Sequence, residues 1–263
     1  MKQTKYFIGL IIFLLLSFSL SFADDSLQVI LTISEIIPLV YTNISLVCKG
    51  DLNNDGYNDI ILPECEYDNN RGRVRIFFGG SVLDTIPDII IIGENLHDRF
   101  GKSVSIGDMN GDGYDELIVG ALFYGIYPPD YGRVYIYLGS ENFDNIPDII
   151  LDGINYAPDP WGVAFGCCVD NTGDFNNDTY KDLVITAPGP DMFYYGNVYI
   201  FFGGETIDTQ PDFFYQGEGL SCTGSYLSVG DINGDNYSDI GIGTGWGSNL
   251  LLMFLGGENI IPV

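Results

Sequence analysis

Short apolar runs recur along the whole chain and are separated by Gly, Asp, Asn and Pro. The runs are rich in Val, Ile, Tyr and Phe, and such residues between turn-forming residues predict β-strands. At residues 134–138, Val-Tyr-Ile-Tyr-Leu, apolar side chains occupy both alternating faces of the expected strand. A strand of this kind must be covered on both sides of its sheet. Beyond the first 23 residues no helical stretch is evident, so the pattern predicts an all-β fold.

The apolar runs are arranged around a nine-residue acidic motif that occurs four times. Its copies read DLNNDGYND, DMNGDGYDE, DFNNDTYKD and DINGDNYSD, and they begin at intervals of 57, 66 and 57 residues. Each copy belongs to a unit with four short apolar segments, and repetition of this kind indicates an array of similar units. A four-stranded sheet of about 60 residues, covered on both faces by its neighbours, is the blade of a β-propeller.

Oxygen-bearing side chains occupy positions 1, 3, 5 and 9 of every copy, and position 7 would add its backbone carbonyl. Alternating oxygens on a tight turn suit Ca²⁺, which takes about six to eight oxygen ligands. The sequence therefore predicts hairpin loops that bind up to four structural Ca²⁺ ions. The expected ligands are Asp51, Asn53, Asp55, Tyr57, Asp59, Asp108, Asn110, Asp112, Tyr114, Glu116, Asp174, Asn176, Asp178, Tyr180, Asp182, Asp231, Asn233, Asp235, Tyr237 and Asp239. The alternative is that these residues only form hairpin turns.

Position 6 of the motif must turn sharply and favours a residue that tolerates a positive φ. It is Gly56, Gly113, Thr179 and Asn236 in the four copies. Because a β-branched residue is poorly suited to this conformation, we expect the third loop to be the weakest of the four.

The charge and the N-terminal segment bear on location and partners. The chain has 36 acidic and 10 basic residues, for a net charge of −26, which argues against nucleic acid and anionic membranes as partners. Lys2 and Lys5 precede an apolar stretch that ends near Ser21-Phe22-Ala23. This order is typical of a signal peptide, residues 1–23, so we expect an extracellular, secreted or cell-surface protein that is not inserted in the membrane after cleavage. An uncleaved anchor is the alternative.

Five cysteines allow at most two disulfides within the chain. Cys48 and Cys65 flank one acidic loop and its strand, and we expect them to pair. One of the adjacent Cys167 and Cys168 could reach Cys222. The alternative is that all five are small buried thiols.

Two further motifs accompany the acidic loops. Phe100-Gly101 and Phe165-Gly166 open the second and third units, and Gly120-Ala121-Leu122 and Thr186-Ala187-Pro188 follow the strand after each loop. With these residues the chain resembles the FG-GAP repeats of the integrin α-subunit N-terminal β-propeller, over roughly residues 44–257. In two units the Phe-Gly pair is replaced, by Asn43-Ile44 and Thr223-Gly224.

The resemblance implies a β-propeller, and integrin propellers have seven blades, whereas four are visible here. We expect them within residues 24–263, at approximately 44–92, 98–152, 163–216 and 222–257. Either the four blades close into a ring, with residues 27–33 as the closing strand, or they form part of a larger propeller.

The loops opposite the acidic motifs are rich in aromatic residues, and in integrins the matching face binds the ligand. We expect a protein or glycan ligand there, and the alternative is that these rings pack against adjacent loops. The candidate ligand-binding residues are Tyr124, Tyr127, Tyr131, Trp161, Tyr194 and Trp246. The resemblance implies a role in adhesion or ligand recognition. We expect no catalysis, because every acid that can be placed has a metal or turn role. The second hypothesis is a lectin-like or enzyme-accessory propeller of an extracellular carbohydrate-active system.

Overall fold

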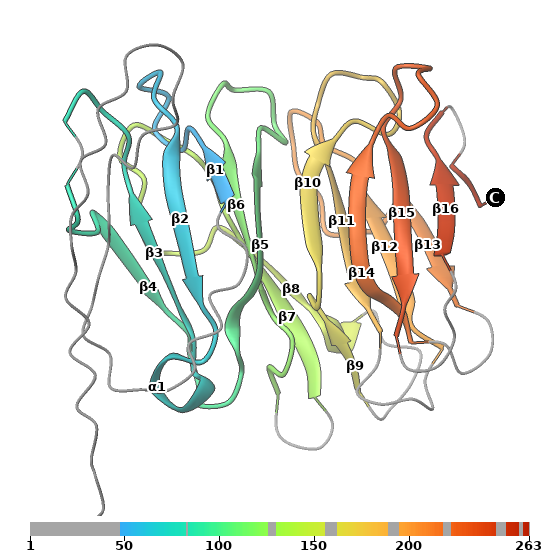
Figure 1. Ribbon diagram of the computed structural model, residues 1–263, viewed down its shortest axis with the longest axis horizontal. Helices are drawn as coiled ribbons and strands as arrows, with labels where there is room; N and C mark the ends of the chain where they lie inside the picture. Colours follow the sequence, from blue (N-terminus) through green and yellow to red (C-terminus); the bar gives the residue numbers. More distant parts are fainter. Residues whose placement is uncertain are drawn as a thin grey trace, which may run out of the picture. The chain divides into compact units, whose positions relative to one another are not determined.

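The computed structural model of the protein describes residues 48–82, 84–125, 130–155, 162–188, 195–217, 222–245, 251–257 and 260–262. All of them lie in one compact unit, residues 37–263. The described strands form antiparallel sheets in which consecutive strands lie side by side (Figure 1). The prediction of an all-β fold built from four-stranded sheets is confirmed, and we call these sheets blades 1 to 4.

Each blade follows the chain order from its first to its fourth strand. Blade 1 contains β1 (Cys48–Gly50), β2 (Asp59–Glu64), β3 (Arg73–Phe77) and β4 (Ile89–Ile92). Blade 2 contains β5 (Phe100–Gly107), β6 (Glu116–Ala121), β7 (Asp130–Tyr137) and β8 (Ile149–Asp152). Blade 3 contains β10 (Val169–Gly173), β11 (Asp182–Ala187), β12 (Asn197–Phe201) and β13 (Phe213–Gln216). Blade 4 contains β14 (Thr223–Gly230), β15 (Asp239–Thr244), β16 (Leu251–Leu255) and β17 (Ile261–Pro262).

Three short elements complete the fold. α1 (Tyr67–Asn70) and η1 (Gly153–Asn155) are single turns, and β9 (Gly162–Phe165) pairs in parallel with β7 of blade 2. No backbone pairing among the described strands joins blade 1 to blade 4, so ring closure is not shown. Residues 27–33, the predicted closing strand, lie outside the described residues, and β17 pairs with β16 at the place of a fourth strand.

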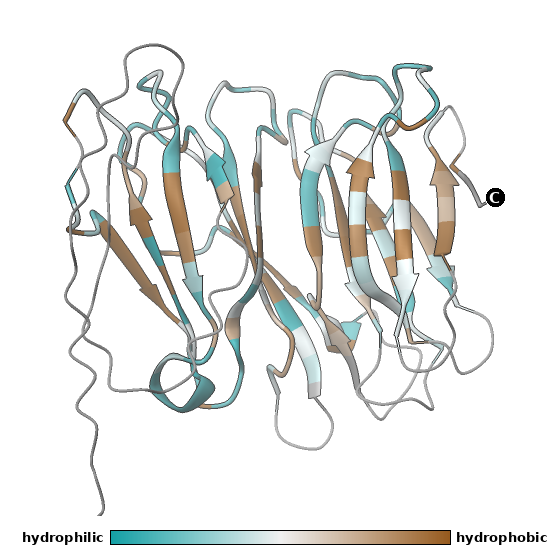
Figure 2. Cartoon of the chain, viewed as in Figure 1, coloured by the Kyte–Doolittle hydropathy of each residue, from teal (hydrophilic) through white to brown (hydrophobic). Residues whose placement is uncertain are grey.

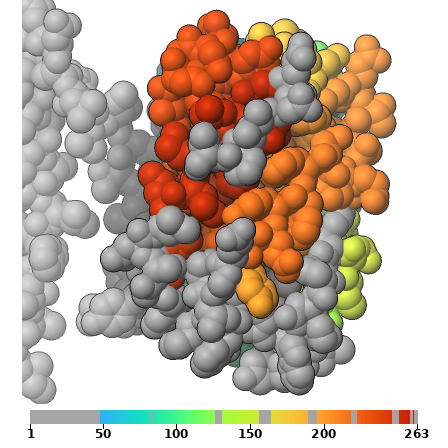
Figure 3. All heavy atoms as spheres, turned by 90° about the vertical axis from the view of Figure 1, so that its right-hand side faces the viewer, coloured from blue at the N-terminus to red at the C-terminus, as the bar shows by residue number. Residues whose placement is uncertain are grey.

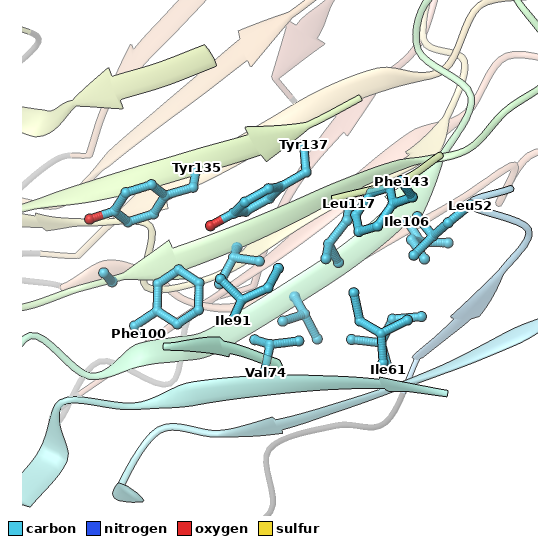
Figure 4. Packing of buried hydrophobic residues seen from close by; sticks show 14 residues of the cluster. Leu52, Ile61, Val74, Ile91, Phe100, Ile106, Leu117, Tyr135, Tyr137 and Phe143 are labelled. Atoms are coloured by element: carbon cyan, nitrogen blue, oxygen red, sulfur yellow. The ribbon is translucent and has the colours of Figure 1, made fainter. Parts of the chain in front are cut away.

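The core lies between neighbouring blades. The apolar residues alternate between two interfaces: Leu117 and Val119 of β6 pack with blade 1, whereas Ile118 packs with blade 3. Figure 2 shows the resulting apolar bands along the strands, and Figure 4 shows the interface of blades 1 and 2. In Figure 4, side chains of blade 1, including Ile61 and Val74, face those of blade 2. The strands are therefore apolar on both faces because a middle blade is covered on both sides.

The Phe-Gly motif joins each blade to the one before it. The Phe100 N–H donates to the Arg71 carbonyl (3.1 Å), and the Phe100 ring meets Tyr135 edge-on with 5.3 Å between centroids. A Cβ atom on Gly72, whose φ is +85°, would lie 1.9 Å from the Phe100 carbonyl oxygen. Only glycine permits this approach, because it has no Cβ and tolerates a positive φ.

The same contact recurs at the other interfaces, with Gly132 against Phe165 and Gly196 against Thr223. Thr223-Gly224 thus occupies the Phe-Gly position in blade 4, and Gly224 keeps a positive φ of +101°. Asn43-Ile44, the other departure from the motif, lies outside the described residues.

The predicted disulfides are wrong, because none of the five cysteines forms a disulfide. Cys48 lies opposite Ile61, and Cys65 follows four residues later, which places it about 13 Å away along the strand. That distance exceeds the roughly 7 Å that a disulfide can span between Cα atoms. Cys168 instead donates its S–H to the Ser225 carbonyl (3.6 Å), which leaves no bond to Cys222.

Candidate functional site

Each acidic loop connects the first two strands of its blade and is held by hydrogen bonds from its own backbone. In blade 1 the Asp51 carboxylate accepts the N–H groups of Asp55 (3.1 Å) and Gly56 (2.9 Å). Asn53 Oδ1 accepts the same Asp55 N–H (3.1 Å), and Asp55 Oδ1 accepts the Tyr57 N–H (2.9 Å). The side chains at positions 1, 3 and 5 therefore all lie on one turn.

The other three loops repeat this geometry. In each, the position 1 carboxylate accepts the backbone N–H of position 6, at distances of 3.1, 3.0 and 3.0 Å. The position 5 carboxylate accepts the N–H of position 7 at 2.9, 3.0 and 3.0 Å. The acidic loops are thus four copies of one local structure, as the repeated motif predicts.

The acid at position 9 has a role that the sequence alone did not reveal. Asp59 is fully buried, and its two oxygens accept the N–H groups of Leu52 (2.9 Å) and Gly79 (2.8 Å). Asp182 and Asp239 make the equivalent pair of bonds. This carboxylate therefore ties the loop to the end of the third strand of its own blade, in addition to being a candidate metal ligand.

Burial raises the pKa of three position 9 acids, Asp59, Glu116 and Asp182, because it disfavours the charged form. The pKa of Asp59 rises to about 6, that of Asp182 to about 7 and that of Glu116 to about 8. Backbone N–H donors oppose the shift, whereas the neighbouring acids of the same loop add to it. A cation among these acids would favour their ionised forms.

The donors in each loop fit Ca²⁺ in type, although not in their present directions. A carboxylate oxygen that accepts one N–H keeps a further lone pair for a metal, whereas Asp231 Oδ1 already accepts two N–H groups. Across the described ranges, however, no three acidic, histidine or cysteine side chains converge closely enough to hold a metal ion. The calcium ligands therefore remain a prediction.

Position 6 adopts the left-handed conformation that the sequence predicts. Its φ is +86° at Gly56, +90° at Gly113, +82° at Thr179 and +73° at Asn236. Asn adopts this conformation readily, whereas a β-branched residue is strained in it by about 1 to 3 kcal/mol.

We expect the substitution Thr179→Gly to stabilise the protein by about 1 kcal/mol, because relief of the strain exceeds the added entropy of the unfolded chain. Urea unfolding measures the change. Asn236→Gly is the matched control at the same loop position and should change stability much less. If Thr179→Gly instead lowered the stability, the backbone of Thr179 would not be strained in the native loop.

The acidic loops also join neighbouring blades. The carbonyl of position 1 accepts an N–H from position 8 of the next loop, as in Asp51 with Asp115 (3.0 Å). The carbonyl of position 2 accepts an N–H from the end of the next blade's third strand, as in Leu52 with Ser140 (2.9 Å). Both bonds recur at the next two interfaces, at 3.1 and 2.8 Å and then at 2.8 and 2.8 Å. We call these two bonds the interblade loop pair.

The opposite end of blades 1 and 2 carries an ionic and aromatic cluster. The Arg133 guanidinium lies 3.6 Å from the centre of the Tyr124 ring and bonds Asp152 (2.7 Å) and Glu94 (3.2 Å). Glu94 also accepts the hydroxyl groups of Tyr124 and Tyr135, each at 3.1 Å. Tyr124 is therefore held by intramolecular contacts, as in the alternative given for the aromatic residues.

Of the other five candidate aromatic residues, one lies among the described residues. Tyr131 is half-buried. Tyr127, Trp161, Tyr194 and Trp246 lie outside the described residues. The sequence offered no signal for Arg133 or Glu94, because their partners come from other strands and a different blade.

Comparison with known proteins identifies the repeats. The FG-GAP repeat model matches residues 100–137 and 171–201. Integrin alpha-5 of Xenopus laevis is 29% identical over 226 residues, which cover 80% of this chain and 20% of that protein. Integrin alpha-7 of Rattus norvegicus is 32% identical over 182 residues, or 67% of this chain and 15% of that protein. The chain carries FG-GAP repeats and is homologous to integrin α subunits, and it spans a fifth or less of the length of these relatives.

Among solved structures, a rhamnogalacturonan lyase of Bacillus licheniformis superposes with a TM-score of 0.46 and 15% identity. The superposition covers 81% of this chain and 46% of that one. Within the ranges that the structure describes, no helix has the length and apolar character needed to cross a membrane.

Proposed function

We propose that this chain is an exported, calcium-binding FG-GAP module that acts in adhesion or ligand recognition without catalysis. The observation that carries the proposal is the recurrence of one acidic loop in four blades, with the same donor types in the same order and the same hydrogen bonds. The homology to integrin α subunits supports the adhesion role.

In this proposal the role of Ca²⁺ is structural. A bound ion would supply positive charge among three carboxylates, which otherwise repel one another at close range. The residues of the chain would do the rest: position 9 ties the loop to the third strand, and positions 1 and 2 tie it to the next blade. Calcium would therefore stabilise the sheet hairpins and the blade interfaces together.

The proposed location is extracellular, secreted or at the cell surface, and it rests on the signal peptide predicted at residues 1–23 and on the integrin homology.

We place the ligand at the end of the blades opposite the acidic loops. All five arginines of the chain lie in blades 1 and 2, on strands or loops that are at this end or run toward it. The chain as a whole has a net charge of −26. Four of them pair with acids, whereas Arg99 packs over the Phe123 ring (5.2 Å) and has no ion pair among the described residues. Arg99 is thus available to an acidic group of a protein ligand.

An adhesion assay tests this function. Cells should attach to a surface coated with residues 24–263 in calcium, and chelation should reduce attachment severalfold. Arg99→Ala should reduce it as well, whereas Arg71→Ala, which removes an arginine already paired with Asp68, should not. Protease treatment of the cells should abolish attachment, and enzymatic removal of their glycans should leave it intact. Attachment no stronger than to albumin would refute the proposal, and loss after deglycosylation would favour the lectin-like alternative.

A further inference from the structure

Blade 4 leaves one half of the repeated interface unused. At the three interfaces between blades, the carbonyls of positions 1 and 2 accept N–H groups from the following blade. The corresponding carbonyls of Asp231 and Ile232 have no such bond in the part of the chain that is described. The Ile232 side chain is 59% exposed, whereas Leu52, Met109 and Phe175, at the same loop position, are each 0% exposed.

The exposed surface extends over the third strand of blade 4. Leu251 pairs with Gly243 and is 64% exposed, although its counterparts Val134 and Val198 are fully buried. Residue 241 of blade 4 is a glycine, whereas the equivalent residues of the other blades are larger and apolar. Leu251 Cδ1 lies 4.0 Å from the point that a Cβ on Gly241 would occupy. Leu251 thus lies beside the glycine, and with Tyr226, which is 70% exposed, it gives this face exposed apolar side chains. Figure 3 views this side of the molecule, with blade 4 in orange to red.

Blade 1 leaves the complementary half unused. In blade 1 the residues equivalent to the two N–H donors are Asn58, at position 8, and Gly80, at the end of the third strand. Neither N–H has a partner in the described ranges. Tyr57 is 49% exposed. At an internal interface the equivalent tyrosine packs on the preceding loop, where a Cβ on Gly111 would lie 2.6 Å from the Tyr180 ring.

The matching glycine of blade 4 is open. A Cβ on Gly234 would meet no atom within 4 Å, and the same holds for Gly230. The counterparts of Gly230 at the internal interfaces are close to the next blade, as Gly173 is to Val229. Blade 4 therefore offers two hydrogen-bond acceptors, an open glycine and an apolar face. Blade 1 offers the matching features, two donors and an exposed tyrosine.

We propose that two copies of this chain assemble head to tail, with blade 4 of each copy docked on blade 1 of the other. Each junction would reproduce the interblade loop pair, with Asn58 and Gly80 donating to the Asp231 and Ile232 carbonyls of the partner copy. Two such junctions close a ring of eight blades, which is within the known range for propellers. Closure through two identical junctions also satisfies the symmetry of a two-subunit ring, because a rotation of half a turn relates them.

Sedimentation analysis of residues 24–263 at micromolar concentration in calcium tests the assembly. We expect a mass twice that of the chain. Leu251→Glu should weaken the dimer at least about tenfold, because it places a charge in the docked apolar face. Ile146→Glu is the matched control, since Ile146 is 66% exposed and lies on a loop of blade 2 away from the junction. Tyr57→Ala should weaken the dimer from the other side and keeps the backbone carbonyl of its loop.

Mixing the two weakened variants distinguishes a head-to-tail contact from a symmetric one. A Tyr57→Ala copy still has a native blade 4, and a Leu251→Glu copy still has a native blade 1, so one native junction can form between them. Because one substitution already breaks a junction, we expect the mixed dimer, which has both substitutions in one junction and keeps the other native, to be more abundant than the dimer of either variant alone. A native chain that is monomeric at all concentrations, a dimer unaffected by Leu251→Glu, or a mixture with no recovery would each overturn the proposal.

Discussion

Removal of calcium should lower the melting temperature of residues 24–263 by at least about 5 to 10 °C. A single site held at 100 times its dissociation constant contributes about 2.7 kcal/mol by mass action. For a domain of this size, 1 kcal/mol shifts the melting temperature by about 2 to 4 °C. Occupation of more than one loop would make the shift larger. The effect should be strong because each loop is tied to the third strand of its own blade, and the first three loops also contact the next blade.

The measurement compares thermal unfolding in excess calcium with unfolding after chelation and dialysis, and elemental analysis counts the bound metal. Magnesium is the control ion, because its smaller size and demand for octahedral geometry make it a poor substitute in such a loop. We expect little recovery with magnesium. Unchanged melting after chelation, together with no metal in the purified chain, would contradict the calcium hypothesis.

The strand pattern could be predicted from the sequence because alternation and turn residues act over a few positions. Apolar residues on both faces of residues 134–138 indicated covered sheets, and Tyr135 and Ile136 do pack into different interfaces. The acidic loops could be predicted equally well, since the hydrogen bonds to the side chains at positions 1, 3 and 5 join residues at most five positions apart. The positive φ at position 6 could be predicted for the same reason, because it depends on the turn formed by neighbouring residues.

Contacts between distant segments could not be read in this way. The interblade loop pair uses backbone groups, which carry no residue identity, and joins residues such as Asp51 and Asp115. The cysteine pairing failed for a related reason: Cys48 and Cys65 lie on neighbouring strands, as expected, but the register separates them. The Arg133 cluster depends on Glu94 of the preceding blade, and no local pattern indicates that contact.

Phe165→Ala should destabilise the protein by about 3 to 5 kcal/mol, the cost of removing a large, fully buried aromatic side chain. Phe165 ends β9, just before blade 3, and packs in the interface of blades 2 and 3, where its ring meets Tyr199 edge-on with 5.4 Å between centroids. Its backbone also pairs with Gly132 of β7. The loss of the ring would leave a cavity where the two blades meet, and the close backbone contacts around Gly132 limit how far the site can collapse.

Phe214→Ala is the matched control, because the Phe214 ring contacts the same tyrosine with 5.2 Å between centroids but is 47% exposed. It should cost about 1 kcal/mol, as is typical of a partly exposed site. Urea unfolding in excess calcium measures both variants under conditions in which the metal does not limit stability. If the Phe-Gly motif joins blades as its contacts indicate, Phe165→Ala should lower the unfolding midpoint far more than Phe214→Ala. Equal midpoints for the two variants would mean that the interface does not depend on the buried ring, and the packing explanation of the motif would fail.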